Sequence, residues 1–409
     1  MRRLRLWPSL AGLPRNARNS IRMEPLWAVF GTPVTYYAPL YMAAVGLSST
    51  QIGALGSITL AFSLLFQTVA APITNRVGRK RTTLIGDLIS WTVPMFVWAV
   101  SRSFESFVLA AVLSAVGRIV TVSWSLLVIE DVEETQRPRV FGIFNLIIAG
   151  CGLLTPLLGL LMTQHGVAPV MRVYYTLGGV GMTIMFLLRN AITQETRSGQ
   201  AAMHEHQDLH PWQSVQQTLR HVAGLRQHAG LPSVMLFYVL SIFTEQMSVF
   251  QILFLGGPLH FGAGALSLVP VAGAVITALM YAGVLRRLSG VAAERTLVVA
   301  RLLGLLGAVL LLLIPAANIT ALLLTVSVLG AATFLTQTFR DTVLFNRLPQ
   351  HGTADLYSAV QTLCLLCSVP AGALAGFIYS THPRTLFVVL AVLNALLLAM
   401  AVWLARRRV

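Results

Sequence analysis

Residues 51–81 read QIGALGSITLAFSLLFQTVAAPITNRVGRKR, an uncharged run that ends in a strongly basic turn. The first charged residue is Arg76, and three more cations follow by residue 81. About 20 apolar residues are enough to cross the hydrocarbon core of a bilayer as a helix. Ser48 and Gln51 have the spacing of a capping box at its start. Because loops rich in Lys and Arg stay on the cytoplasmic side, this stretch predicts a transmembrane helix that ends at that face.

Apolar runs of this length recur along the whole chain of 409 residues. Hydrophobic residues make up 56% of the chain and charged residues 11%, whereas soluble domains carry roughly 25% charged residues. A soluble fold could not bury so much apolar surface, so we predict an all-α membrane protein with twelve transmembrane helices. The predicted spans are 24–46, 51–72, 82–101, 105–128, 139–163, 169–190, 232–256, 262–284, 294–315, 318–340, 355–379 and 384–405.

The basic residues gather in the loops on one side of this predicted bundle. If the N-terminus is inside the cell, the cytoplasmic segments hold 24 of the 29 Lys and Arg residues. The outer loops hold only Arg102, Arg172 and Arg384, while Arg118 and Arg301 lie within spans. This asymmetry predicts a multi-pass protein of the cell membrane with both termini in the cytoplasm. The basic residues behind the net charge of +15 form no basic face on a soluble domain. We therefore expect the lipid bilayer as a partner and no nucleic acid.

The chain divides into two similar halves around its longest polar stretch. The predicted units are a basic cytoplasmic arm at 1–23, a six-helix bundle at 24–190, a cytoplasmic linker at 191–230 and a second six-helix bundle at 231–409. An internal repeat supports the division, because APITNRVG at 71–78 ends the second span and GVLRRLSG at 283–290 ends the eighth. Duplicated halves of this kind form two pseudo-symmetric bundles in one known transporter plan.

Two features could suggest metal or redox chemistry, but both have simpler explanations. The linker contains HEHQDLH at 204–210, which we interpret as a solvated loop because no pair of ligand-bearing helices is evident. Cys364 and Cys367 form a C-x-x-C inside an apolar run, where small residues serve helix packing. We therefore expect no metal and no cofactor. Residues 211–227 carry an apolar stripe that predicts an amphipathic helix on the inner membrane surface.

The stretch from Ala71 to Arg81 resembles the signature loop of the major facilitator superfamily. That pattern reads Gly-x-Leu-Ala-Asp-Arg-x-Gly-Arg-Lys and joins the second helix to the third. The matching positions are Ile73, Arg76, Gly78, Arg79 and Lys80, whereas Ala71 replaces the first glycine and Asn75 the aspartate. The twelve spans, the linker and the repeat extend the resemblance to the whole chain. It implies a fold of two six-helix bundles and a transport function, without naming a substrate.

The resemblance further implies that this loop acts as a conformational latch. In relatives the loop pairs with an acidic residue at the inner end of the fourth helix, where Glu130 and Asp131 lie here. The alternative is that its basic residues only set the topology. The predicted latch consists of Asn75, Arg76, Gly78, Arg79, Lys80, Glu130 and Asp131. We interpret Asp87 as a counter-charge for Arg76 or Arg79, and Glu24 as an interfacial charge.

Polar residues at helical spacing mark the predicted transport pathway. The resemblance implies that the first, fourth, seventh and tenth helices line a central cavity. These spans carry polar stripes, which must face protein or water because lipid cannot satisfy their hydrogen bonds. The candidate residues of the substrate or proton pathway are Thr32, Tyr36, Arg118, Thr121, Trp124, Tyr238, Ser241, Glu245, Gln246, Thr336 and Gln337.

Arg118 and Glu245 are the strongest of these candidates, because each places a charge near the middle of a span. Such a charge costs roughly 2.5–3.5 kcal/mol on insertion scales. We therefore expect both residues to be functional, with Glu245 as the carboxylate that carries a coupling proton. The alternative is a buried ion pair that joins the two halves.

The sequence favours a secondary active transporter that moves a small organic molecule by alternating access. It contains no G-x-x-x-x-G-K-[ST] loop, no G-x-S-x-G and no H-E-x-x-H, so we predict no enzyme. Gly150, Gly152, Pro156 and Gly159 partly resemble the Gly-rich, Pro-containing stretch of proton-driven exporters, which favours proton-coupled efflux. We expect the protein to be a monomer. The alternatives are uptake of a sugar, peptide or organic anion, and a membrane sensor or scaffold without transport.

The predicted topology can be tested by cysteine labelling in a variant whose three native cysteines are replaced. A cysteine at Ser198, in the predicted linker, should react with an impermeant maleimide only after the cells are permeabilised. A cysteine at Ser103, in a predicted outer loop, should react in intact cells and serves as the control. Labelling of the Ser198→Cys variant from outside would contradict the predicted orientation.

Overall fold

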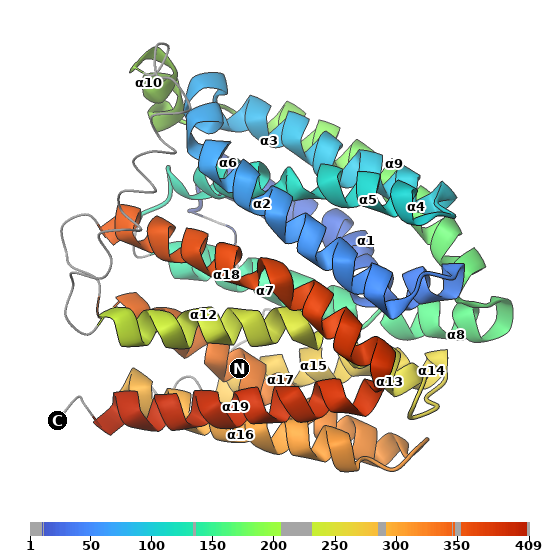
Figure 1. Cartoon of the computed structure of the whole chain (residues 1–409). Helices are drawn as coiled ribbons and strands as arrows, with labels where there is room; N and C mark the ends of the chain where they lie inside the picture. The colour runs from blue at the N-terminus through green and yellow to red at the C-terminus, as the bar shows by residue number, and fades with distance from the viewer. Residues whose placement is uncertain are drawn as a thin grey trace, which may run out of the picture.

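The computed structural model describes residues 10, 12–133, 136–205, 231–284, 292–345, 347 and 353–406. These residues form helices and no strand, which confirms the predicted fold class of an all-α membrane protein. Figure 1 shows the helices in two groups, with the N-terminal half in blue to green and the C-terminal half in yellow to red.

The N-terminal half contains six long helical segments, three of them built from consecutive pieces. Its elements are α1 (Arg15–Val45), α2 (Ser49–Val77), α3 (Arg79–Asp87), the π-helix η1 (Leu88–Thr92), α4 (Val93–Val100), α5 (Phe104–Ala115), α6 (Gly117–Ile129), α7 (Arg137–Gly152), α8 (Thr155–His165) and α9 (Val167–Ile192). The predicted capping box is present, since Ser48 and Gln51 each accept a hydrogen bond from the other's backbone N–H. Pro94 is the second residue of α4, just after η1, and Pro156 is the second residue of α8, so proline accounts for two of the interruptions.

The short helix α10 (Arg197–Glu205) follows, and the C-terminal half then repeats the plan. Its elements are α12 (Leu231–Met247), the 3-10 helix η4 (Ser248–Phe250), α13 (Gln251–Gly256), α14 (Ala263–Leu266), α15 (Leu268–Leu279), the π-helix η5 (Met280–Val284), α16 (Ala293–Leu313), α17 (Ile319–Phe345), α18 (Thr353–Thr381) and α19 (Pro383–Arg406). The predicted amphipathic helix at 211–227 lies outside the described residues.

Eleven segments among the described residues are helices long and apolar enough to cross a membrane. The remaining predicted span is α1, which is less apolar because it contains three prolines and several Tyr and Thr residues. It packs against α6, α7, α9 and α13. A helix surrounded by protein needs less apolar surface than one that faces lipid, so α1 is an inner helix of the bundle.

The first turns of α1 are held against the end of α9. Asn16 and Asn19 donate side-chain hydrogen bonds of 2.8 Å to the carbonyl oxygens of Gln194 and Ile192. The helix therefore begins at Arg15, before the predicted start of the span at residue 24. Residues 15–23, which the sequence pattern placed in the N-terminal arm, are the first turns of α1.

The two halves meet through small residues at one end of the bundle. This end carries residues 46–48, 101–103 and 257–262, and we call it the far end. Here α2 lies against α18 (Figure 1). A Cβ atom on Gly53 would lie 2.3 Å from the carbonyl oxygen of Gly372. Ala373 donates its backbone N–H to the Oγ of Ser57 at 2.8 Å. Small residues allow helix backbones to approach this closely.

A second contact between the halves joins α8 and α14 at the same end. Thr155 donates its hydroxyl to the carbonyl oxygen of Ser267 at 2.9 Å. A Cβ atom on Gly159 would lie 2.4 Å from the Cβ of Ser267, so these backbones also approach closely. Tyr36 of α1 donates to the carbonyl oxygen of Leu266 at 2.7 Å. From the far end, α2 and α18 separate toward the opposite end of the bundle (Figure 1).

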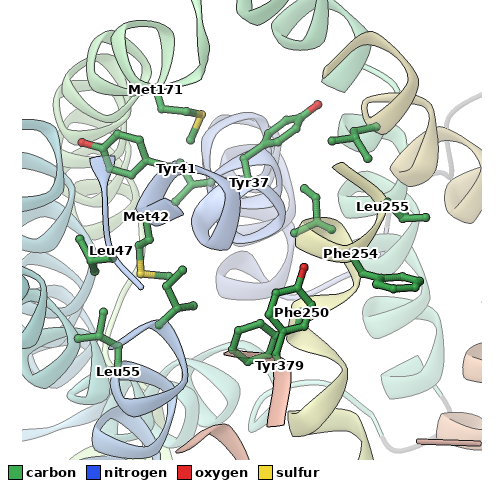
Figure 2. Close-up of a cluster of buried hydrophobic side chains, with 14 of the residues drawn as sticks. Tyr37, Tyr41, Met42, Leu47, Leu55, Met171, Phe250, Phe254, Leu255 and Tyr379 are labelled. Carbon is green, nitrogen blue, oxygen red and sulfur yellow. The ribbon is translucent and has the colours of Figure 1, made fainter. Parts of the chain in front are cut away.

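A hydrophobic core continues across this contact. Figure 2 shows Tyr37 and Tyr41 of α1 in one cluster with Phe250 and Tyr379 of the C-terminal half. The rings of Phe250 and Tyr379 stack with their centroids 5.0 Å apart. Tyr41 donates its hydroxyl to the carbonyl oxygen of Trp98 at 2.7 Å, so its polar end is satisfied although the residue is buried. A single core therefore joins the two halves at the far end.

The contact between α2 and α18 should tolerate no side chain at Gly53. A Gly53→Ala substitution places a methyl group against the Gly372 carbonyl and should destabilise the contact by about 1–3 kcal/mol, as overpacking does. Hydrogen–deuterium exchange across residues 49–60 and 366–381 should become faster. Gly56→Ala is the matched control, because its Cβ would lie 3.9 Å from the Cα of Gly372. Equal exchange in both variants would show that this contact does not hold the far end together.

Candidate functional site

The predicted latch forms an ion pair at the end of the bundle that carries Gly78, Glu130 and Glu195, which we call the latch end. Arg79 donates to Oε1 of Glu130 from Nη2 at 3.0 Å and from Nε at 3.2 Å. Both side chains are largely buried. The hydroxyl of Thr196 donates to the other carboxylate oxygen of Glu130. The structure thus brings together the basic loop and the end of α6, as the resemblance implied.

Glu195 completes the latch end, although no sequence pattern pointed to this residue. Its carboxylate accepts the backbone N–H groups of Arg79 at 3.1 Å and Lys80 at 2.9 Å. These are free donors at the start of α3, where a negative charge also favours the helix dipole. Gly78 has φ +92°, and a Cβ there would lie 2.6 Å from Oε2 of Glu195. Glycine at this position therefore permits both the turn and the cap.

Three of the predicted latch residues make no contact of this kind. Arg76 and Asp131 are exposed and Asn75 is half-buried, and none has a hydrogen bond or ion pair within the part of the chain that the structure describes. Asp87 does not neutralise Arg76 or Arg79, so that interpretation was wrong. It is buried inside the N-terminal half and pairs with Arg189 of α9.

A cavity of about 440 Å³ lies within the N-terminal half. Of the predicted pathway residues, Arg118, Thr121 and Trp124 of α6 line it. The Asp87–Arg189 pair and Glu24 line the same cavity. Glu24 is only 7% exposed, so it is not the interfacial charge that the sequence suggested. Its position nine residues beyond the start of the helix follows from the earlier start of α1 at Arg15.

Glu245 belongs to a cluster of polar side chains inside the C-terminal half. Its carboxylate accepts a hydrogen bond of 2.8 Å from Nη1 of Arg340. Arg301 of α16 and Arg340 of α17 both donate to the hydroxyl of Ser241. The guanidinium of Arg340 also lies 4.7 Å from the ring centre of Tyr238. Tyr238, Ser241 and Glu245 therefore gather around two arginines whose role the sequence did not reveal.

This cluster contradicts the alternative of a buried pair that joins the halves. Glu245 pairs with Arg340 of its own half, while Arg118 has no ion-pair or hydrogen-bond partner among the described residues. Glu245 and Thr336 line a cavity of about 140 Å³. The carboxylate is the more accessible member of the pair, with 34% of the side chain exposed against 9% for Arg340.

Two further cavities lie between the halves and contain the remaining candidates. One of about 300 Å³ is lined mainly by apolar residues of the N-terminal half, together with Gln246, Val249 and Gly372 of the other half. The second, of about 630 Å³, lies between α7 and α15 and has Thr32 and Gln337 in its wall. Tyr36 instead joins the halves at the far end through Leu266. The predicted pathway residues are therefore distributed over four cavities and their borders.

No group of three or more His, Cys, Asp or Glu side chains that could hold one metal ion occurs among the described residues. The histidine-rich segment lies outside them from residue 206 onward.

Besides the fold, the amino-acid sequence itself can be compared with known protein families. A model described as the Major Facilitator Superfamily matches residues 27–372. The chain belongs to the major facilitator superfamily. Membership confirms the resemblance carried by the loop at residues 71–81 and indicates a membrane transporter with a small-molecule substrate.

Known proteins similar to this transporter fall into two groups. Multidrug resistance protein MdtL of Shewanella oneidensis is 25% identical over 168 residues, which is 41% of this chain and 41% of that protein. The match therefore spans less than half the length of that relative. The nucleoside transporter NupG has a TM-score of 0.71 at 12% identity, with 96% of this chain and 99% of that chain covered. A peptide transporter POT in complex with sulfate has a TM-score of 0.68 at 16% identity, with 98% and 96% covered. At these identities the structures show a shared fold alone.

The latch end yields a prediction for Gly78. A Gly78→Leu substitution should leave membrane insertion intact but lower the transport rate severalfold, because the side chain displaces the Glu195 cap and adds backbone strain of about 1–3 kcal/mol. Gly166→Leu is the matched control, since Gly166 has nearly the same backbone (φ 84°, ψ 158°) but only Pro169 within reach, at 3.7 Å. Flux and melting temperature of both purified variants decide the question. If Gly78→Leu transports no worse than Gly166→Leu, the latch plays no part in transport.

Proposed function

We propose that this transporter exports a moderately hydrophobic organic compound across the cell membrane in exchange for protons, by alternating access. The observation that carries the proposal is the cavity of about 300 Å³ between the halves. Its walls are mostly aliphatic and aromatic, with few polar groups such as Gln246 and Thr35. Sites of this kind bind apolar molecules and orient them with a small number of hydrogen bonds.

The position of this cavity suits alternating access. Most of its wall comes from α1, α2, α4 and α5 of the N-terminal half, and the rest includes α12, η4 and α18 of the C-terminal half. A rocking motion of the halves would therefore change its surroundings. Gly53 and Gly372 line it and also form the contact at the far end. Separation of α2 and α18 would therefore open the cavity toward the far end.

Glu245 is the proposed proton-coupling residue. It is the more exposed partner of an ion pair with a buried guanidinium, and it lines a cavity, so a proton can reach it. Protonation removes the negative charge and leaves Arg340 without this partner. Loss of the carboxylate charge beside a buried guanidinium is costly, which favours a rearrangement of α12 against α17. A proton at Glu245 could thereby shift the balance between two arrangements of the halves.

The direction of transport is supported by the relative named as a multidrug resistance protein. The runner-up, uptake of an organic anion, is supported by Arg118, which faces its cavity without a counter-ion among the described residues.

The direction of the pH gradient that drives accumulation distinguishes export from uptake. A melting-temperature screen of the purified protein against aromatic drugs and metabolites would first identify a ligand. In proteoliposomes, an exporter that exchanges solute for protons should accumulate this ligand when the lumen is acidic. A symporter for uptake should accumulate it when the lumen is alkaline. A ligand that binds but never crosses the membrane would favour the sensor.

The Glu245→Gln variant should distinguish a role of Glu245 in proton coupling from a structural role. If the carboxylate carries the proton, the variant should fold, bind the ligand normally and exchange it across the membrane, yet show no accumulation on a pH gradient. Glu105→Gln, at an exposed position, is the control. A structural role predicts a lower melting temperature for Glu245→Gln. A second substitution, Arg340→Gln, should then raise it again, because it removes the buried guanidinium that lost its interaction with Glu245. Continued accumulation by Glu245→Gln on the gradient would exclude it as the coupling site.

A further inference from the structure

The cavity of the N-terminal half contains four charged side chains, which makes it unlike the apolar cavity between the halves. Glu24, Asp87, Arg118 and Arg189 all line it. Asp87 and Arg189 are buried and form an ion pair with each other, so their charges are already balanced. Arg189 also lies over the ring of Phe186 at 5.3 Å. One carboxylate and one guanidinium then remain for whatever enters the cavity.

Glu24 and Arg118 are these two groups. Neither has a hydrogen bond or ion pair with another of the described residues. They come from different helices, α1 and α6, and they face the same space without pairing with each other. A ligand that enters displaces water from both groups and must replace the lost interactions, because an unpaired charge in a dry site is costly.

The walls of the cavity indicate what kind of molecule would carry the charges complementary to Glu24 and Arg118. Trp27 and Trp91 stand at 87° to each other with ring centroids 5.1 Å apart. Trp124 lies in the wall and packs edge-on against Phe144. Indole rings bind flat aromatic groups and also attract ammonium groups. A volume of about 440 Å³ accommodates a molecule of one or two rings.

We propose that this cavity is the subsite for a zwitterionic aromatic solute, with its acidic group on Arg118 and its ammonium group on Glu24. The proposal rests on the transport function and names the substrate class. A simple anion would leave Glu24 desolvated and unpaired, and a simple cation would do the same to Arg118. A zwitterion satisfies both groups and leaves the net charge of the site unchanged.

Three indole compounds test this assignment by calorimetric titration of the full chain in nanodiscs. L-tryptophan carries both charges, N-acetyl-L-tryptophan only the acid and tryptamine only the ammonium. L-tryptophan should bind about tenfold more tightly than either of the others, because it alone makes both charge-assisted hydrogen bonds. Equal affinity of the three compounds, a preference for one of the singly charged ones, or no binding to the folded protein would overturn the proposal.

Two variants assign the charges to their residues. Glu24→Gln should weaken L-tryptophan about tenfold and leave N-acetyl-L-tryptophan unchanged, whereas Arg118→Gln should weaken L-tryptophan and leave tryptamine unchanged. Glu105→Gln and Arg102→Gln, both at exposed positions, are the matched controls. Loss of all three compounds in either variant would indicate a structural role and contradict the assignment. If a variant does not fold, the order of affinities in the natural protein still decides.

Calorimetric titration measures binding and requires no transport. Failure of the subsite proposal is therefore distinguishable from failure of the proposed function. A protein that prefers L-tryptophan but gives no flux on either gradient would retain this subsite and lose the exporter. Gradient-driven flux of another ligand, with no preference among the three indole compounds, would support the exporter and contradict the subsite.

Discussion

The bilayer core offers no partner for a charged group, so each charge inside the bundle has to be neutralised by the protein or hydrated in a cavity. The structure meets this constraint within each half. Arg79–Glu130 and Asp87–Arg189 lie in the N-terminal half, and Glu245–Arg340 lies in the C-terminal half. Each of these three ion pairs lies within a single half. Separation of the halves therefore leaves these ion pairs intact.

What joins the halves is correspondingly simple. Glycine backbones meet where α2 crosses α18, a few hydroxyl groups donate to carbonyl oxygens, and aromatic side chains form a shared core at the far end. Dispersion between closely packed backbones falls off steeply with distance. A contact of this kind is stable when closed and loses its energy over a short separation, which suits two alternating arrangements better than gradual deformation.

The sequence predicted the features that depend on local pattern. Uncharged runs between basic turns located the helices, and Ser48 with Gln51 marked a helix start that the structure reproduces. The partners of buried charges could not be predicted, because packing brings together residues far apart in the chain. Arg189 and Arg340 were counted with loop charges, yet both are buried and bind carboxylates on other helices. Glu195 stood in the linker with no pattern around it, and only the fold places its carboxylate at the start of α3.

The distribution of charge also bears on how a proton and a solute could act on one another. Glu245 lies in the C-terminal half beside two guanidinium groups, while Glu24 and Arg118 lie in the N-terminal half with no ion pair between them. The apolar cavity between the halves carries no charged side chain in its wall. On the proposed function, a proton and a solute would therefore not compete for one carboxylate. Their effects could meet only through the relative position of the halves, because Glu245 lies inside one half and the subsite with Glu24 and Arg118 lies inside the other. Coupling would then be mechanical, through the glycine contact at the far end, rather than an exchange of ligands at a shared group.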